Sequence, residues 1–311
     1  MRIKKYLLAK LKTRKSEVYL KMNSNLFITV ASWEERFLIG FKRIIKKSNL
    51  TDVQMYYFEE YAERTVNHRQ AVKELCKKRS IHITDYQISF KNSAESWKTI
   101  YKNMASLAPA ANVTVDITTM PREIIWTVLS LLDTNCIKAS YVYHKPASYD
   151  KEWLTRDPAK PRLVYKRAGM TKLGVSTCLL ILTGYDVDRV QQLINFFEPS
   201  TTLLGIQKGK QLNNLKSNIE KSKKYEKEPG VKVFYVDAYC SDHGLAEIEK
   251  HIAPYIKTTN LVMSSLGPKL SAIALYKLNR KYPDTALAYA PSREFNPEYS
   301  HGIGKTFTGS L

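Results

Sequence analysis

The chain carries the stretch Leu26-Phe-Ile-Thr-Val-Ala-Ser-Trp-Glu-Glu-Arg36 and, one domain length later, the counterpart Leu179-Leu-Ile-Leu-Thr-Gly-Tyr-Asp-Val-Asp-Arg189. In both, a short apolar run ends in an aromatic residue, a carboxylate and an arginine. A second pair follows in the same order, Asn112-Val-Thr-Val-Asp-Ile-Thr-Thr-Met-Pro-Arg122 and Asn260-Leu-Val-Met-Ser-Ser-Leu-Gly-Pro-Lys269. The landmarks keep their order and separation, which indicates a tandem duplication of one structural unit.

Each copy alternates short apolar runs, typical of buried strands, with amphipathic helical patterns. Copy one predicts the elements Asn25–Ala31, Glu34–Lys47, Val53–Phe58, Asn67–Arg79, Ile81–Ser89, Ala94–Leu107, Val113–Ile117, Pro121–Leu132 and Ile137–Tyr143. Copy two predicts Cys178–Thr183, Asp188–Phe197, Thr202–Gly205, Gln211–Tyr225, Val231–Tyr239, Leu245–Tyr255, Leu261–Ser264, Lys269–Lys281 and Thr285–Ala290. This alternation predicts an α/β fold of two tandem Rossmann-like repeats with mostly parallel sheets, related by a pseudo-two-fold axis.

The repeats set the expected domain organisation. We expect a basic leader over 1–22, repeat 1 over 23–156, a linker over 157–175, repeat 2 over 176–295 and a C-terminal tail over 296–311. Two prolines in the segment Asp157-Pro-Ala-Lys-Pro-Arg162 prevent either neighbour from continuing through it, so this segment predicts the linker.

Composition narrows the class of protein. Among 311 residues, 44% are hydrophobic and 11% aromatic, which is typical of a globular protein. The net charge of +20 favours a polyanionic partner, namely nucleic acid, a nucleotide or an acidic protein; the alternative is that the lysines only keep a basic protein dispersed. No apolar run approaches the roughly 20 residues that span a bilayer, so no membrane is expected. Four cysteines without paired short spacing favour a reducing, cytoplasmic location.

Polar residues follow the first strand of each copy, at the edge where open parallel sheets bind ligands. Copy one offers Trp33, Glu34 and Arg36, and copy two offers Tyr185, Asp186 and Arg189. As ligand-binding residues, the aromatic rings would stack on a base and the arginines would hold a phosphate or fix the carboxylates. The alternative, equally open, is that the carboxylates and arginines only serve the ends of the following helix.

The turn after the fourth strand supplies a second candidate site in each copy. Copy one has Thr118, Thr119, Pro121 and Arg122, and copy two has Ser264, Ser265, Pro268 and Lys269. Free N–H groups, two hydroxyls and a cation at a helix start make an anion cradle. Helix capping explains the hydroxyls and the proline equally well, but not a cation beside the positive end of the helix dipole. We therefore favour anion binding.

No catalytic residue is assigned from the sequence. The histidines are scattered, without His-Glu-x-x-His or Cys/His metal spacing, and no Gly-x-Ser-x-Gly turn occurs. We therefore expect neither a metal nor a cofactor, apart from a nucleotide or oligonucleotide as ligand. Whether the chain is an enzyme is left open, with a non-enzyme favoured. A metal-dependent nuclease relying on Glu34 or Asp116 is one alternative.

The turn Asp116-Ile-Thr-Thr-Met-Pro-Arg122 is similar to the Asp-x-Thr-Gly-Gly-Thr-Lys turn of CARF domains. It matches at Asp116 and Thr118, with Arg122 in place of the lysine, but it lacks the paired glycines. Together with the tandem Rossmann-like pair, it resembles the CARF and SAVED sensors of bacterial antiviral defence. The resemblance implies that the chain binds cyclic or linear oligonucleotides.

The function predicted from these observations is that of a non-catalytic sensor or recognition subunit. It would bind a phosphate-bearing nucleotide or oligonucleotide between its two repeats, within a multi-component antiviral defence complex that contains a protein partner. The main alternative is a basic nucleic-acid-binding subunit of such a complex. That subunit would use the leader and the lysine-rich segment 208–227.

Overall fold

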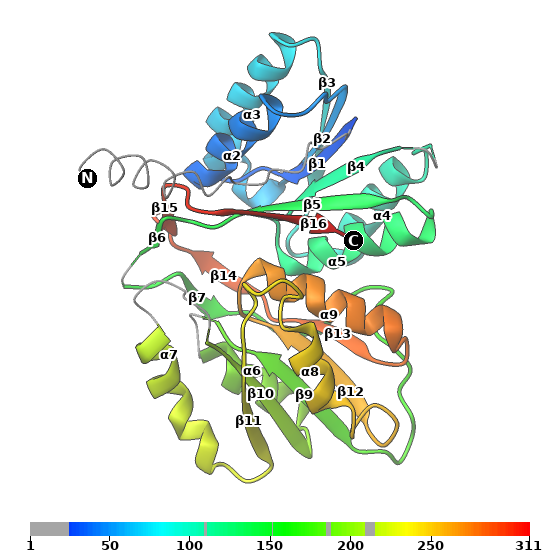
Figure 1. Cartoon of the computed structure of the whole chain (residues 1–311), viewed down its shortest axis with the longest axis vertical. Helices are drawn as coiled ribbons and strands as arrows, with labels where there is room; N and C mark the ends of the chain where they lie inside the picture. The colour runs from blue at the N-terminus through cyan, green and yellow to red at the C-terminus, as the bar shows by residue number, and fades with distance from the viewer. Residues whose placement is uncertain (1–24, 109–110, 151, 185–187, 209–214) are drawn as a thin grey trace, which may run out of the picture.

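The computed structural model of the chain describes residues 25–108, 111–150, 152–184, 188–208 and 215–311. Two six-stranded sheets, one from each predicted repeat, lie one above the other in Figure 1. The predicted basic leader lies outside the described residues, as do Tyr185 and Asp186 and the first residues of the helix predicted over Gln211–Tyr225.

Strands and helices alternate in both repeats, as the sequence predicts. Repeat 1 contains β1 (Leu26–Val30), α2 (Glu35–Ile45), β2 (Asp52–Phe58), α3 (Ala62–Lys77), β3 (His82–Ile88), α4 (Ser93–Met104), β4 (Val113–Asp116), α5 (Arg122–Thr134) and β5 (Ala139–His144). Repeat 2 contains β9 (Thr177–Leu182), α6 (Asp188–Phe197), β10 (Thr201–Gln207), α7 (Leu215–Ser222), β11 (Val231–Val236), α8 (Leu245–Ile252), β12 (Asn260–Ser265), α9 (Lys269–Lys281) and β13 (Ala286–Tyr289).

The strand order is the same in the two sheets. Repeat 1 has the order β3-β2-β1-β4-β5 and repeat 2 the order β11-β10-β9-β12-β13. All of these neighbours pair in parallel, with Leu26 opposite both Asp52 and Val113 in the first sheet. The order reverses between β1 and β4 and between β9 and β12, where parallel sheets bind ligands. The chain is therefore an α/β protein of two Rossmann-like repeats, which confirms the predicted fold class.

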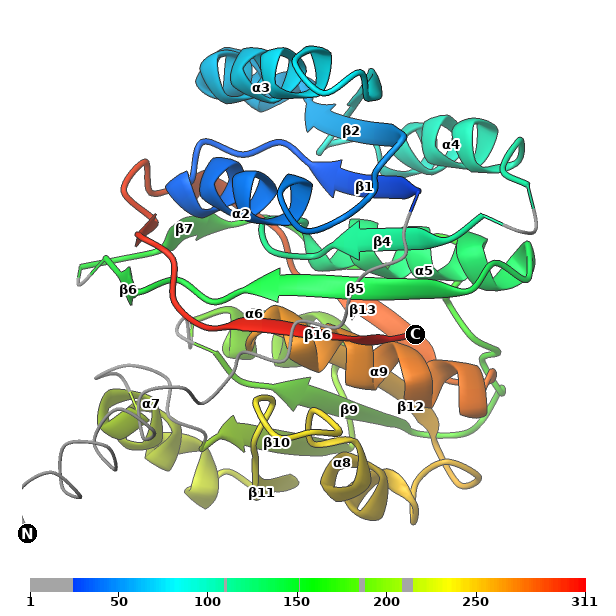
Figure 2. The same cartoon turned by 45° about the horizontal axis from the view of Figure 1, so that its top comes forward.

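The two repeats share a core. On the outer side of each sheet, α2 and α3 form one apolar cluster around Phe41, and α6 contributes to another around Leu193. The inner helices α4, α5, α8 and α9 contribute to a cluster that runs through both repeats and contains Trp126. The Trp126 indole N–H donates a hydrogen bond to the Ala272 carbonyl at 2.9 Å, and α5 packs on α9 between the sheets (Figures 1 and 2). Both α5 and α9 begin at their cations, Arg122 and Lys269, facing the same junction.

Each repeat gives its last strand to the sheet of the other repeat. After repeat 1, β8 (Arg162–Leu163) pairs antiparallel with β13, and after repeat 2, β16 (Thr306–Ser310) pairs antiparallel with β5. In Figure 2, β16 runs along β5. The intervening segments pair with each other, β7 (Thr155–Pro158) with β14 (Ser292–Phe295) and β6 (Ser148–Tyr149) with β15 (Ser300–His301).

We call β6, β7, β8, β14, β15 and β16 the exchanged segments. The sequence analysis treated the linker and the tail as lying outside the repeats, and this view missed their strands. Two of them, β8 and β16, cover one edge of each six-stranded sheet and so remove an unpaired strand edge.

Candidate functional site

A cavity of about 90 Å³ lies where the two repeats meet, at the carboxyl ends of the parallel strands. It is lined by the loop after β1, the first residues of α5 and α9, Arg189 of α6, Tyr289 of β13, and the exchanged strands β7 and β14. A single buried water needs about 10–15 Å³ on this measure, so the cavity has room for several waters or for a compact polar group.

Two cationic side chains that line this cavity each donate a hydrogen bond to the other repeat. Arg122, at the start of α5, donates a hydrogen bond from Nη2 to the Gly267 carbonyl in the turn before α9. Lys269, at the start of α9, donates from Nζ to the Met120 carbonyl in the turn before α5, at 2.6 Å. Each cation therefore caps the turn of the other repeat. These two hydrogen bonds explain why a cation lies at the start of each helix even when no ligand is bound. The unfavourable position of each cation beside the positive end of the helix dipole is therefore no longer an argument for anion binding.

Positive charge nevertheless exceeds negative charge around the cavity. Among the described residues that line it, four side chains are cationic and one is a carboxylate: Arg36, Arg122, Arg189, Lys269 and Glu34. Burial and the nearby guanidinium of Arg122 hold the pKa of Lys269 well below its usual value. Burial and the charge of Arg189 lower the pKa of Arg122. The cavity is thus an environment in which cations repel one another and an anion would be stabilised.

The arginine that recurs after the first strand has the same structural contact in both repeats. Arg36 Nη1 donates to the His144 carbonyl at the end of β5, and Arg189 Nη1 donates to the Ala290 carbonyl after β13. Arg36 also forms an ion pair with Glu34 at 2.9 Å. Glu34 is the N-cap residue of α2, but its side chain makes no capping hydrogen bond to the helix. These arginines tie the first helix of each repeat to its fifth strand while lining the cavity.

Aromatic rings form one wall of the cavity around Trp33. Its ring centroid lies 5.4 Å from that of Tyr61 and 6.2 Å from that of Phe295, which belongs to the exchanged strand β14. Phe90 packs edge-on against Phe295 at 5.8 Å. The indole N–H of Trp33 has no hydrogen-bond partner among the described residues, and the same holds for Nε of Arg122. Both residues line the cavity, and an acceptor that reaches either buried N–H would satisfy it.

The hydroxyls of the fourth-strand turns do not act together. Thr119 lines the cavity, and its hydroxyl donates to a β1 carbonyl at 3.0 Å. Thr118, Ser264 and Ser265 are buried and lie outside the cavity lining. The Thr118 hydroxyl accepts a hydrogen bond from a β5 backbone N–H at 3.0 Å, and the Ser265 hydroxyl contacts that of Ser271 at 2.6 Å. Of the four predicted hydroxyls, the structure brings only that of Thr119 to the cavity.

Asp116 lies behind the turn and not in the cavity lining. Burial raises the pKa of its carboxyl to about 6, although the carboxyl accepts hydrogen bonds from the Thr118 N–H at 2.9 Å and from the Thr29 hydroxyl at 3.4 Å. The residue that carries the resemblance to CARF turns is therefore oriented toward the protein interior. Among the described residues, no group of three or more His, Cys, Asp or Glu side chains is placed to hold a metal ion.

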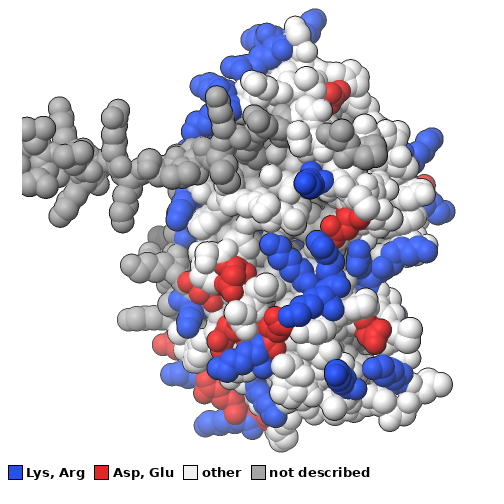
Figure 3. All heavy atoms as spheres, turned by 45° about the vertical axis from the view of Figure 1, so that its right-hand side comes forward, with Lys and Arg blue, Asp and Glu red and all other residues white. Residues whose placement is uncertain are grey.

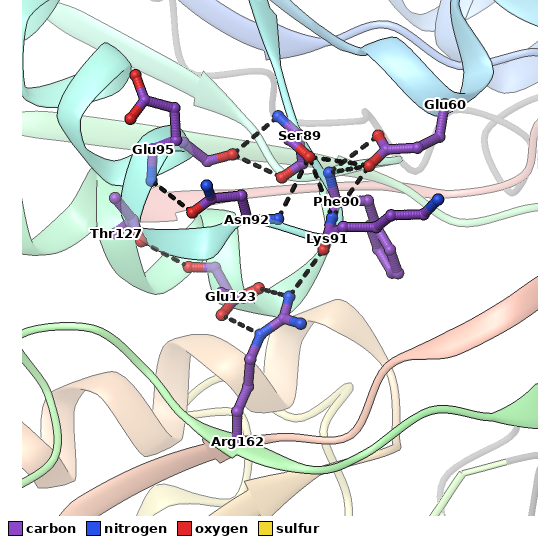
Figure 4. A network of polar contacts seen from close by, with 10 residues as sticks. Glu60, Ser89, Phe90, Lys91, Asn92, Glu95, Glu123, Thr127 and Arg162 are labelled. Carbon is purple, nitrogen blue, oxygen red and sulfur yellow. Dashed lines mark hydrogen bonds and ion pairs between the residues drawn. The ribbon is translucent and has the colours of Figure 1, made fainter.

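A polar network behind the aromatic wall fixes the loop that carries Phe90 (Figure 4). The Glu60 carboxylate accepts hydrogen bonds from the N–H groups of Phe90 at 2.9 Å and Lys91 at 3.0 Å. Burial alone would raise the pKa of Glu60, but these N–H groups outweigh it and lower the pKa. Arg162, in the exchanged strand β8, donates to the Phe90 carbonyl at 3.1 Å and to the Glu123 carboxylate at 2.9 Å. The exchanged segment is thereby connected to the cavity wall.

Several lining residues were missed by the sequence analysis. Phe295, Tyr299 and Thr155 come from segments that the sequence analysis placed at or beyond the ends of the repeats, and Phe90 comes from a loop with no motif. Tyr289, the last residue of β13, also lines the cavity. No local signal identifies Thr155, Phe295 and Tyr299, because they lie in or beside the exchanged segments, whose pairing places them at the cavity. The binding roles proposed for Tyr185 and Asp186 concern residues outside the described part of the chain.

No protein-family profile matches the chain, and no curated protein matches it. Three solved structures show low similarity. The cytoplasmic domain of a prokaryotic cation chloride cotransporter shares 11% identity over 88% of this chain and 98% of its own, with a TM-score of 0.30. A universal stress protein from Archaeoglobus fulgidus DSM 4304 shares 9% identity over 87% and 97%, with a TM-score of 0.26. A functionally unknown protein from Pseudomonas aeruginosa PAO1 shares 8% identity over 86% and 92%, with a TM-score of 0.27.

None of these likenesses supports the transfer of a function. Among the described residues, no helix has the length and apolar character needed to cross a bilayer.

Proposed function

We propose that the chain is a non-catalytic sensor or recognition subunit that binds a phosphate-bearing nucleotide or oligonucleotide between its repeats, with a phosphate group in the cavity. The observation that carries this proposal is the charge of the cavity. Four cationic side chains and one carboxylate line a small space that aromatic rings border on one side. A phosphate suits the cations, and a base suits the rings.

The hydrogen-bonding groups of the cavity support the same ligand. Arg122 uses Nη2 for the Gly267 carbonyl and leaves Nε unpartnered, and the Trp33 N–H is also unpartnered among the described residues. Leaving a buried donor unpaired costs about 1–3 kcal/mol, so an acceptor that reaches either N–H would stabilise the protein. Phosphate oxygens are strong acceptors, and arginine binds them in a fixed geometry.

The finer part of the proposal is a CARF-like or SAVED-like role in antiviral defence, in the cytoplasm and together with a protein partner. It rests on the tandem Rossmann-like repeats and on the turn that ends in Arg122. The inward orientation of Asp116 and Thr118 separates this turn from a simple phosphate cradle. The ligand would instead contact the cations, Thr119 and the aromatic wall.

A thermal-shift panel tests the proposal. The full chain is titrated with inorganic phosphate, AMP, and linear and cyclic oligoadenylates of two to six nucleotides. The proposal expects at least one compound to raise the melting temperature of the wild type and to lose this effect in Arg122→Gln. Arg280→Gln, at the opposite end of α9, serves as the matched control and keeps the effect, because Arg280 lies outside the cavity and pairs with Asp133. A shift that is equal in all three proteins contradicts the cavity as the site.

A further inference from the structure

A cluster of three aromatic rings, two of them exposed and one half-buried, lies on α4 and in the segment after β8, and none of its members lines the cavity. The rings of Trp97 and Tyr101 stack with centroids 4.9 Å apart and an interplanar angle of 11°. The ring of Tyr165 lies 5.1 Å from that of Trp97. Tyr101 is 47% exposed and Tyr165 is 42% exposed, whereas most aromatic residues of this protein are buried or half-buried. We call Trp97, Tyr101 and Tyr165 the aromatic patch.

Lysines flank the aromatic patch. Lys98 and Lys102 follow Trp97 and Tyr101 directly on α4, so the two lysines form a second stripe beside the two rings at the same four-residue spacing. Both lysines are exposed. The Lys166 ammonium lies 5.7 Å from the centroid of the Tyr165 ring.

The side of the molecule that carries α4 is turned forward in Figure 3. In that view, lysine and arginine side chains form a cluster with carboxylates beside it. One carboxylate of α4, Glu95, lies 3.7 Å from Lys98 and is 61% exposed. An exposed ion pair of this kind contributes little, so Lys98 remains available to a stronger anion.

We infer that the aromatic patch with Lys98, Lys102 and Lys166 is a binding surface for single-stranded nucleic acid. Bases stack on the exposed rings of Tyr101 and Tyr165, and the backbone phosphates lie against the three lysines. Exposed rings beside cations are the combination that binds single strands without sequence preference, because every base presents a flat face. A duplex hides those faces within its own stack, so it leaves the rings unused. The surface is separate from the cavity, and the inference does not depend on the proposed function.

Fluorescence anisotropy with labelled single strands tests the inference on the full chain. The probes are dT12 and rU12, with a 12-base-pair duplex of mixed sequence for comparison. Tyr101→Ala combined with Tyr165→Ala weakens single-strand binding about tenfold or more, since stacking on one aromatic residue has an effect of that size. Tyr101→Phe combined with Tyr165→Phe keeps the rings and retains the affinity.

The lysines are tested through the salt dependence of binding. Lys98→Glu combined with Lys102→Glu weakens binding and lowers the log–log salt slope by about 1.4, at about 0.7 for each phosphate contact of a single strand. The matched control is Lys42→Glu combined with Lys46→Glu. These lysines are exposed, have the same spacing, and lie at the end of α2, which covers the opposite face of the same sheet. The control pair leaves both the affinity and the slope close to those of the wild type.

Three results would overturn the inference. The first is an affinity that is unchanged in both patch variants, which would place any binding elsewhere on the chain. The second is an equal loss in the α2 control, which would show that general positive charge attracts the strand. The third is tighter binding of the duplex than of both single strands. Binding of dT12 and rU12 with similar affinity, or preference for one of them, supports the surface and shows which nucleic acid it takes.

Discussion

Replacing Lys269 by methionine separates a ligand-binding role of the cavity from a structural one. Methionine keeps most of the apolar stem and removes the ammonium, so the side chain still packs at the start of α9. The change removes the hydrogen bond to the Met120 carbonyl and also removes a buried amine whose charged form Arg122, Arg36 and Arg189 repel. The two effects oppose each other. We expect the free energy of unfolding of the apo protein to change by less than about 1 kcal/mol, or no more than about 2–4 °C in melting temperature.

Ligand binding should respond much more strongly. A hydrogen bond between an ammonium and a phosphate contributes about 1.5–3 kcal/mol, so its loss weakens binding about tenfold to a hundredfold. At a ligand concentration of about 100 times the wild-type Kd, the ligand stabilises the wild type by about 2.7 kcal/mol. For the variant, the same relation gives about 1.4 kcal/mol after a tenfold loss and about 0.4 kcal/mol after a hundredfold loss.

Thermal denaturation with and without ligand, together with calorimetric titration, measures both quantities on the same samples. Lys277→Met, two turns along α9 and outside the cavity lining, is the matched control and should behave as the wild type does. The reasoning is refuted if Lys269→Met binds the ligand with unchanged Kd. It is also refuted if the apo variant loses several kcal/mol of stability, because Lys269 would then serve the fold.

Three further predictions follow from the buried groups and the exchanged segments. The pKa of Lys269 is depressed in the apo protein, and a bound anion raises it again, so ligand binding is accompanied by proton uptake and the affinity falls as pH rises. Calorimetric titration in buffers of different ionisation enthalpy measures this proton uptake. An absence of uptake would show that Lys269 is not involved. Burial lowers the pKa of His144 to about 3, so the neutral form is favoured in the folded state and stability is lost as pH falls below about 6.5. Between pH 7 and pH 5, the free energy of unfolding should fall by about 2 kcal/mol less in His144→Gln than in the wild type, as measured by urea denaturation. An equal pH dependence of the free energy of unfolding in the two proteins would contradict the assignment. Deleting residues 306–311 uncovers the edge of β5 and should lower the stability of the protein and promote its self-association. A molecular mass per particle that light scattering finds unchanged by the deletion would argue against the exchanged strand.

The fold was largely predictable because the duplication provided the same pattern twice. The apolar runs of β1 and β9 and the 13-residue helix α9 lie within a residue or two of their predicted limits. Helix α3 begins at Ala62, five residues earlier than predicted, because its first turn is polar and half-exposed and carries little apolar periodicity. Periodicity identifies an element through the face that it buries, so a weakly buried turn is missed.

The exchanged strands were not predictable from local pattern. β8 has two residues, too few to show a strand period, and β16 contains Gly309. Their pairing depends on contacts between residues far apart in the chain, which a single sequence does not display.

The location of the candidate site followed from the rule that ligands bind beyond the carboxyl ends of parallel strands. The hydrogen-bond partners of its cationic side chains could not be predicted from that rule. The sequence placed Arg122 and Lys269 at equivalent helix starts, but only the packing of α5 on α9 shows that each reaches the other's turn. The hydroxyls of Thr118 and Ser265 make hydrogen bonds within their own repeats, with the His144 N–H and the Ser271 hydroxyl.

Native mass spectrometry of the purified full chain tests the central claim most directly, because it counts ligands bound to each protein molecule. Wild type, Lys269→Met and Lys277→Met are compared after incubation with the compound that gives the largest thermal shift. The account predicts one phosphate-bearing molecule per chain in the wild type and in Lys277→Met, and its loss from Lys269→Met. Equal occupancy in all three proteins, or no bound phosphate compound in the wild type, would contradict a ligand site between the repeats.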